Sequence, residues 1–494
     1  MSIATLLSAG ALATAFAATP CEELTTLPLG NARITDARMI PAGASTTGRG
    51  GAGPALPAHC RVAAVLAPSP DSHIEMEIWL PAPDTWNGKF LAVGNGGWAG
   101  SISTGAIAAG LGDGYATASN DTGHRGGGGA FALGHPEKLI DFSDRAMHEM
   151  AVHSKTIIDA FYDRAPSLSY YEGCSTGGRQ GLAAAQRYPA DFDAMIVGAP
   201  VYNQTRLHAS QVQKMTEILA DEALFVPPDK ISLIADAVLG VCDRTDGVAD
   251  QILSNPEACG FEPRDLLCAG GGDTAACLAP GQVQSLTRAY QAVRTRPGEL
   301  VYPGHARGFE RGWRMPEPGR APPDLPLDTF RYLAHQDADW DWREFDLDAD
   351  LALALGNAGH LEATEADLGA FRDRGGKMIV YHGWNDPGPS PFNTLQYHQR
   401  VQDATGPDTD DWLRVFMMPG VGHCRGGVGP DQADFLGALE AWKESGIAPD
   451  RITASRARGG AVDMTRPLCP YPQIAKWTGA GSANEAGNFT CEAP

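Results

Sequence analysis

A serine flanked by two glycines stands in the segment GCSTG, where Gly173 and Gly177 bracket Ser175. The segment follows an apolar run, SLSYYEG, and precedes a helical pattern, TGGRQGLAAAQRY. A strand, a sharp glycine-flanked turn and a helix in this order form a nucleophile elbow, which lifts the serine oxygen clear of the sheet. Ser175 is therefore predicted to be a nucleophile; a glycine-rich turn without chemistry is the alternative.

Two strand ends further along the chain offer partners for this serine. In an α/β hydrolase the triad runs Ser, then Asp or Glu, then His, each at the carboxyl end of a core strand. The strand pattern KMIVYHG is followed by Asp386, and RVFMMPG is followed by His423. We expect Ser175 to attack a carbonyl, His423 to take and return the proton, and Asp386 to orient the imidazole. His382 and Asp373 are rivals, but His382 precedes the only well-placed acid and breaks the order.

An acyl-transfer site also needs backbone donors for the carbonyl oxygen. The N–H of Thr176, the residue after the nucleophile, is one; the loop VGNGGWAG should supply another. The same loop reads G-x-G-x-x-A from Gly94 to Ala99, a dinucleotide-binding pattern that the serine elbow explains better. His148 and His153, in HEMAVH, are one residue too far apart for a zinc-binding helix and are predicted to be surface histidines.

Strand and helix patterns alternate around these residues. Seven segments are predicted as strands: HIEMEIWLPA, KFLAVGNGG, YATASND, SLSYYEGC, FDAMIVGAP, GKMIVYHG and LRVFMMPG. Helical patterns cover 142–163, 176–188, 391–404 and 432–445. Near-continuous apolar strands alternating with helices indicate an α/β fold with a mostly parallel sheet. The alternation breaks in the middle, so we expect an α/β-hydrolase core over 22–202 and 374–494, interrupted by a large lid insertion over 203–373.

The ten cysteines contain no CxxC pair and no zinc-like Cys/His spacing. An even count favours disulfides in an oxidising compartment. Cys174 directly precedes Ser175 and Cys424 directly follows His423, so a hydrogen bond between serine and histidine would bring these cysteines within disulfide reach. The expected pairs are Cys174–Cys424, Cys242–Cys259, Cys268–Cys277, Cys469–Cys491 and Cys21–Cys60.

Charge and the N-terminal residues bear on partners and location. The chain has 494 residues, with 38 Lys and Arg against 59 Asp and Glu, a net charge of −21. This balance argues against nucleic acid and anionic membrane as partners. Residues 1–17 form a short apolar run ending in the A-x-A pattern of a signal peptide, although without its basic start. The protein is therefore expected to be secreted or periplasmic.

The pair of motifs GCSTGG and GVGHC resembles the tannase and feruloyl esterase family, whose hallmark is a Cys-Ser, Asp, His-Cys arrangement joined by a disulfide. The blocks VGNGGWAG, YATASNDTGH, GGRQGL and HGWND also look like family blocks in the right order, over nearly the whole mature chain. The group also contains the bacterial hydrolase of mono(hydroxyethyl) terephthalate. The resemblance implies that Gly97, with Gly96 next, supplies the second oxyanion donor.

Three aspartates, Asp243, Asp246 and Asp250, lie on one short segment of the predicted lid. Carboxylates on a tight loop repel one another unless a hard cation is present, and oxygen-only ligands suit calcium. A solvated acidic turn is the alternative. The resemblance implies a structural Ca²⁺, with the backbone carbonyls of Val248 and Ile252 as further ligands.

The predicted function is that of a serine carboxylesterase acting on esters of aromatic acids, feruloyl esters first, through an acyl-enzyme on Ser175. A small aromatic ester or a plant cell-wall ester would be the substrate. Tannase and terephthalate monoester hydrolase are alternatives, and a hydrolase-fold binding protein without activity is the alternative from another class. Lid aromatics could stack on the substrate ring, although packing within the lid is the commoner role for any one of them; they are Trp340, Trp342, Phe345 and Tyr332.

Overall fold

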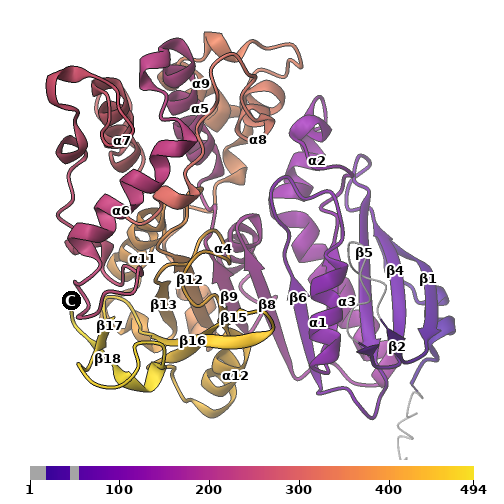
Figure 1. Cartoon of the computed structure of the whole chain (residues 1–494). Helices are drawn as coiled ribbons and strands as arrows, with labels where there is room; N and C mark the ends of the chain where they lie inside the picture. The colour runs from indigo at the N-terminus through magenta and orange to yellow at the C-terminus, as the bar shows by residue number, and fades with distance from the viewer. Residues whose placement is uncertain (1–17, 45–54) are drawn as a thin grey trace, which may run out of the picture.

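The computed structural model describes residues 18–44 and 55–494, and the predicted signal segment 1–17 lies outside them. A nine-stranded sheet forms the centre, in the order β1-β4-β5-β7-β6-β8-β9-β12-β13 (Figure 1). The strands are β1 (Ala32–Ile40), β4 (His59–Leu66), β5 (Ile74–Pro81), β6 (Lys89–Val93), β7 (Ala116–Asn120), β8 (Leu168–Cys174), β9 (Ala194–Gly198), β12 (Lys377–Gly383) and β13 (Leu413–Met418). The seven predicted strands are confirmed as β5 to β9, β12 and β13.

The sheet is parallel where the predicted site residues lie. Strands β7, β6, β8, β9, β12 and β13 pair in parallel, whereas β1, β4 and β5 add antiparallel neighbours at one side. The parallel strands end at one edge of the sheet, so their carboxyl ends present loops side by side. Every residue of β9 is buried, as a strand covered on both faces requires.

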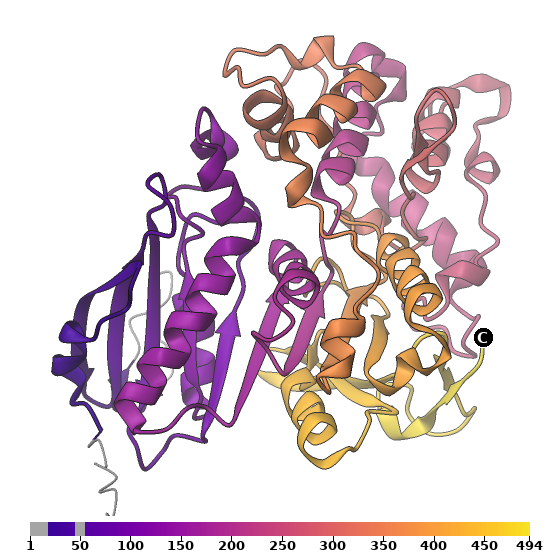
Figure 2. The same cartoon turned by 180° about the vertical axis from the view of Figure 1, so that it is seen from behind.

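Helices cover both faces of the sheet (Figures 1 and 2). One core contains buried residues of α3 (Ala146–Tyr162), α4 (Thr176–Arg187) and α11 (Pro391–Thr405); the other contains those of α1 (Thr104–Gly112) and α12 (Phe435–Ser445). The prediction placed a helix from 432, but 432–433 form the short strand β14 (Gln432–Ala433), which pairs with β15 (Ile452–Arg458). The capping carboxylate of Asp434 then starts α12 by accepting the Gly437 N–H at 2.8 Å.

The chain between β9 and β12 forms the insertion that was predicted to be a lid; it lies at the upper left of Figure 1 and is called the lid below. Its elements are α5 (Gln204–Ala220), α6 (Ile231–Cys242), α7 (Pro280–Tyr290), β10 (Val293–Arg294), β11 (Leu300–Tyr302), α8 (Asp324–Asp328) and α9 (Leu347–Ala358). Two clusters of buried apolar side chains give the lid its own core. After α12, the chain adds β16 (Ala461–Leu468) and a hairpin of β17 (Ile474–Trp477) and β18 (Phe489–Glu492), and Trp477 N–H donates to the Asp246 carbonyl of the lid at 3.0 Å.

All five predicted disulfides are present. Their Cα–Cα distances are 5.7 Å for Cys21–Cys60, 6.0 Å for Cys174–Cys424, 5.2 Å for Cys242–Cys259, 5.0 Å for Cys268–Cys277 and 5.6 Å for Cys469–Cys491. Five disulfides are typical of a protein folded in an oxidising compartment. Over residues 18–44 and 55–494, no helix has the length and apolar character needed to cross a bilayer.

Candidate active site

Ser175 occupies the turn between β8 and α4 in a backbone conformation that side chains rarely adopt. Its φ is 66° and its ψ is −119°. The surrounding backbone holds it there, because Ser175 N–H donates to the Gly198 carbonyl at 2.9 Å and the Ser175 carbonyl accepts from Val201 N–H at 3.2 Å. A Cβ on Gly173 would lie 2.7 Å from the Gly177 backbone, so the elbow closes only with glycine there. Backbone strain at a half-buried hydroxyl is typical of a functional site.

The structure brings the three predicted residues into one hydrogen-bonded chain. Ser175 Oγ lies 2.8 Å from His423 Nε2, and His423 Nδ1 lies 2.7 Å from Asp386 Oδ2. A carboxylate only accepts, so Nδ1 carries the proton and Nε2 is free to accept the serine proton. The rival acid Asp373 instead pairs with Arg372 at 2.8 Å in α10 (Gly369–Asp373).

The charges of the acid and the histidine support each other. Asp386 is fully buried, and burial by itself would raise its pKa; hydrogen bonds from His382 and His423 nevertheless hold that pKa at about 2. Gly388 N–H donates to its other oxygen at 2.8 Å. Burial lowers the pKa of His423, but the hydrogen bond and charge of Asp386 outweigh burial and raise it. The imidazolium that forms when His423 takes a proton is therefore stabilised.

The predicted oxyanion residues lie against each other beside the serine. Thr176 begins α4, and within the described chain its N–H has no backbone acceptor, whereas Gly177 N–H donates to the Asn95 carbonyl at 2.7 Å. The Thr176 hydroxyl donates to the Gly97 carbonyl at 2.7 Å. Gly97 itself has a φ of 56°, a conformation that favours glycine. The loop after β6 is thus attached directly to the elbow.

Two amide side chains that the sequence analysis missed lock this loop to α4. Asn95 N–H donates to Gln180 Oε1 at 3.1 Å, and Gln180 Nε2 donates back to Asn95 Oδ1 at 3.2 Å. Asn95 Nδ2 also donates to the Asn120 carbonyl of β7 at 2.8 Å. Both amides are buried. Both stand in the sequence blocks used above, VGNGGWAG and GGRQGL, but only the fold shows that they face each other.

The lid forms hydrogen bonds with the loop after β6 and with the segment that follows Asp386. Trp98, next to the oxyanion glycines, donates from Nε1 to the Leu325 carbonyl at 3.0 Å, and Gly129 N–H donates to Asp328 Oδ2 at 2.8 Å. Four residues after Asp386, Ser390 N–H donates to the hydroxyl of Tyr302 in the lid at 3.2 Å. The lid is therefore hydrogen-bonded next to Gly97, beside the serine, and close to Asp386.

The aromatic residues predicted to stack on a substrate fall into two groups. Trp340, Trp342 and Phe345 pack on the lid core, with the Phe345 ring 4.9 Å from that of Phe330. Tyr332 instead packs with the buried cluster around Trp98, beside the oxyanion loop. Of the four, Tyr332 therefore lies in the cluster nearest the site.

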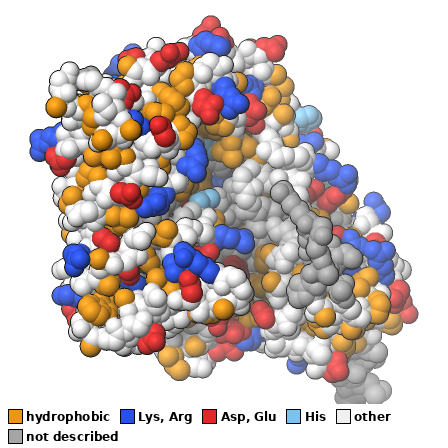
Figure 3. Space-filling view, viewed as in Figure 1, with side chains coloured by type: hydrophobic (Ala, Val, Ile, Leu, Met, Phe, Trp, Pro, Cys, Tyr) orange, Lys and Arg blue, Asp and Glu red, His pale blue; other side chains and the backbone are white. Residues whose placement is uncertain are grey.

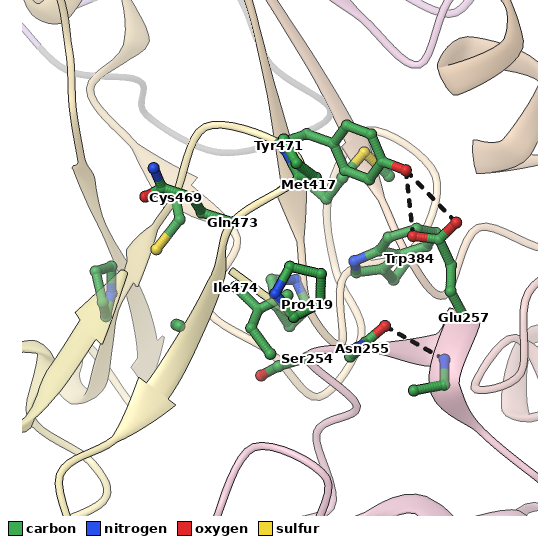
Figure 4. Close-up of a pocket in the computed structure, with 15 residues that line it drawn as sticks. Ser254, Asn255, Glu257, Trp384, Met417, Pro419, Cys469, Tyr471, Gln473 and Ile474 are labelled. Carbon is green, nitrogen blue, oxygen red and sulfur yellow. Dashed lines mark hydrogen bonds between the residues drawn. The ribbon is translucent and has the colours of Figure 1, made fainter. Parts of the chain in front are cut away.

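The molecular surface is hollowed between the lid and the half that carries β4 to β7 (Figure 3). A separate cavity of about 390 Å³ lies where Trp384, Met417 and Pro419 meet the C-terminal segment around Tyr471 (Figure 4). Its lining includes none of Ser175, His423 and Asp386. The Figure 4 cavity is therefore distinct from the space above the serine.

The three aspartates among the five predicted calcium ligands lie on one short segment, where Asp250 N–H donates to Asp243 Oδ1 at 3.3 Å. Burial raises the pKa of Asp243 and of Asp246, and the charge of Asp250 raises both further. The donor set, carboxylates with neighbouring backbone carbonyls, has the chemistry that Ca²⁺ prefers. In the side-chain arrangement of residues 18–44 and 55–494, no three acidic, His or Cys side chains converge as metal ligands. Arg466 of β16 contacts Asp250 instead.

The prediction of surface positions for His148 and His153 is wrong for the second. His153 is buried, and its Nε2 lies 2.8 Å from Asn31 Oδ1. His148 is half-buried and stacks on Tyr188, with ring centroids 3.9 Å apart. Packing of α3 against the N-terminal segment, which the helical pattern alone does not reveal, covers this face.

The sheet order, the strained elbow and the hydrogen-bonded Ser-His-Asp arrangement are those of an α/β-hydrolase fold. A family model described as tannase and feruloyl esterase matches residues 60–322 and 327–492. The chain belongs to this family and is a carboxylic ester hydrolase.

Individual relatives cover most of the chain. An uncharacterized esterase of Xanthomonas campestris pv. campestris is 37% identical over 99% of this chain and 94% of its own length. The mono(2-hydroxyethyl) terephthalate hydrolase of Piscinibacter sakaiensis is 33% identical over 89% of this chain and 86% of its own. The crystal structure of feruloyl esterase B from Aspergillus oryzae matches with a TM-score of 0.89 at 29% identity, covering 96% of this chain and 99% of that one.

Proposed function

We propose that the protein is a serine carboxylesterase that hydrolyses esters of aromatic carboxylic acids, with feruloyl esters as the preferred class. The observation that carries the mechanism is the unbroken chain from Ser175 Oγ through His423 to buried Asp386, at 2.8 and 2.7 Å. The choice of acid rests on the relatives, which include a feruloyl esterase structure that covers 96% of the chain. A binding protein without activity would need neither the hydrogen bonds from Ser175 through His423 to Asp386 nor the strained backbone at Ser175.

The reaction proceeds in two halves. As Ser175 Oγ bonds to the ester carbonyl carbon, its proton passes to His423 Nε2, and the N–H groups of Thr176 and Gly97 receive the developing oxyanion. His423 then protonates the leaving alcohol as the ester C–O bond breaks, which leaves the acyl group on Ser175. Water attacks the acyl carbon, gives its proton to His423, and releases the acid while the serine regains its hydrogen.

The acid preference is tested by comparing three esters at equal concentration: methyl ferulate, methyl gallate and a terephthalate monoester. We expect the highest kcat/KM for methyl ferulate, by about tenfold, because a pocket that fits one ring substituent pattern discriminates by one to three kcal/mol. Initial rates measured by release of the acid give the ratios. A gallate preference would indicate tannase, and a terephthalate preference would indicate a relative of the Piscinibacter enzyme.

We also propose a structural calcium in the lid, held by Asp243, Asp246 and Asp250 with the carbonyls of Val248 and Ile252. The chemistry of the donors supports it, because three aspartates with neighbouring backbone carbonyls form the oxygen-only set that Ca²⁺ prefers. Removing calcium with a chelator should lower the melting temperature by several degrees, because the cation binds the folded loop. Metal analysis of the purified protein should find about one calcium per chain; no bound metal and an unchanged melting temperature would contradict the proposal.

The proposed boundaries and location follow from the same observations. Residues 22–202 and 374–494 would form the catalytic domain and 203–373 the lid, with secretion or export to the periplasm directed by residues 1–17. The five disulfides support folding in such a compartment.

A further inference from the structure

A second histidine contacts the carboxylate of the triad. His382, in β12, is fully buried, and its Nε2 lies 3.1 Å from Asp386 Oδ2, the same oxygen that accepts from His423. Its Nε2 also lies 3.2 Å from the Pro389 carbonyl. Both neighbours can only accept, so Nε2 carries a proton and donates to them.

The other nitrogen of His382 is held as firmly. Nδ1 lies 2.8 Å from the hydroxyl of Thr394, which is buried in the first turns of α11. With Nε2 protonated, the neutral ring accepts the Thr394 proton at Nδ1, so both nitrogens are satisfied. A strand, the acid loop and a helix thereby determine where this imidazole lies.

We propose that His382 is a positioning residue of the active site: its Nε2–H aims Asp386 Oδ2 at His423 and keeps the carboxylate charged. Asp386 then accepts one bond on Oδ1, from Gly388, and two on Oδ2. A buried carboxylate with three donors stays ionised, and its fixed lone pairs fix the His423 ring. The inference rests on the proposed role of the triad.

Three other ionisable groups near this pair keep one charge state between about pH 3 and about pH 8. Burial, with the charge of Lys214, lowers the pKa of His305 to about 3, and burial raises the pKa of Tyr302 well above its usual range. Burial lowers the pKa of Lys214 to about 8. Between the pKa of His305 and that of Lys214, a loss of activity as the pH falls therefore reports the protonation of His423. His423 is the base and must be neutral to accept the serine proton.

The test compares His382→Leu with His382→Gln. Leucine removes the donor, so the pKa of Asp386 rises and its charge acts more strongly on His423, whose pKa rises too. We expect kcat to fall roughly tenfold to a hundredfold with little change in KM, and the acid limb of kcat/KM to move up by about half a pH unit or more. Glutamine can place an amide N–H near the position of Nε2. The His382→Gln variant should therefore recover most of kcat and most of the wild-type acid limb. Thr394→Val, which removes only the hydroxyl, should shift both in the same direction by less.

His398→Leu is the matched control, since His398 is also a buried histidine on α11, and its Nε2 has no hydrogen-bond partner among the residues that the structure describes. It should keep the wild-type pH profile. A His382→Leu protein that melts like the control and keeps wild-type kcat and acid limb would overturn the inference, as would a loss that glutamine does not recover. If wild type itself were no faster than Ser175→Ala, the proposed function would fail instead.

Discussion

Ser175→Ala should lower kcat/KM for feruloyl esters by roughly 10⁴-fold or more, because it removes the atom that forms the acyl bond. The backbone donors and the pocket would remain and account for any residual rate. Alanine keeps the Cβ that the serine already places at a φ of 66°, so the elbow gains no new strain. The melting temperature should therefore stay close to that of wild type. Initial rates with methyl ferulate, and a mass increase by one acyl group in wild type alone, measure the effect.

Ser455→Ala provides the matched control, since this serine lies on β15 and its Oγ bonds only weakly, to the Gln432 carbonyl at 3.4 Å. It should hydrolyse the ester at the wild-type rate. If the two variants had similar rates, the nucleophile would have to be a residue other than Ser175.

The parallel part of the sheet could be predicted because its strands are buried on both faces and so read as short apolar runs. β9, in which every residue is buried, is the clearest case. β1 and β4 were missed. Most residues of β4 alternate between buried and partly exposed, whereas β1 buries only Ile34 and Ala37 and carries arginines at two of its exposed positions. An antiparallel addition at the side of a sheet has no helix on each face to enforce an apolar sequence.

The candidate site, like the sheet, could be predicted from the sequence only in part. Ser175, Asp386 and His423 could be found because each follows its own strand and the chain order is diagnostic. The Asn95–Gln180 pair could not, since its bonds join a loop to a helix and no local pattern specifies them. His382 entered the sequence analysis as a rival of the triad. The structure places it in contact with Asp386, because a strand end and the following loop fold back on each other.

The double variant Cys174→Ala, Cys424→Ala should lose most activity while remaining folded. The disulfide joins positions 250 residues apart, one on each side of the Ser175–His423 hydrogen bond. Cys424 has a φ of 63°, so the loop that presents His423 is held in a conformation that a free chain disfavours. Without the bond this loop can relax, and a displacement of the base by about 1 Å costs roughly a hundredfold in kcat. The variant should also melt at a lower temperature, since the loss of so long a loop closure costs up to about 5 kcal/mol.

Cys268→Ala with Cys277→Ala separates these effects. That disulfide spans only 9 residues and lies in the lid, so its removal should reduce stability without changing kcat. Circular dichroism and thermal melting would establish that both double variants are folded at the assay temperature, where kcat is then compared. Because the nine-stranded sheet and four other disulfides remain in the Cys174, Cys424 variant, a folded protein with low kcat is expected. Full activity in that folded variant would show that the hydrogen bonds alone hold His423 against Ser175, and that the bond serves stability only.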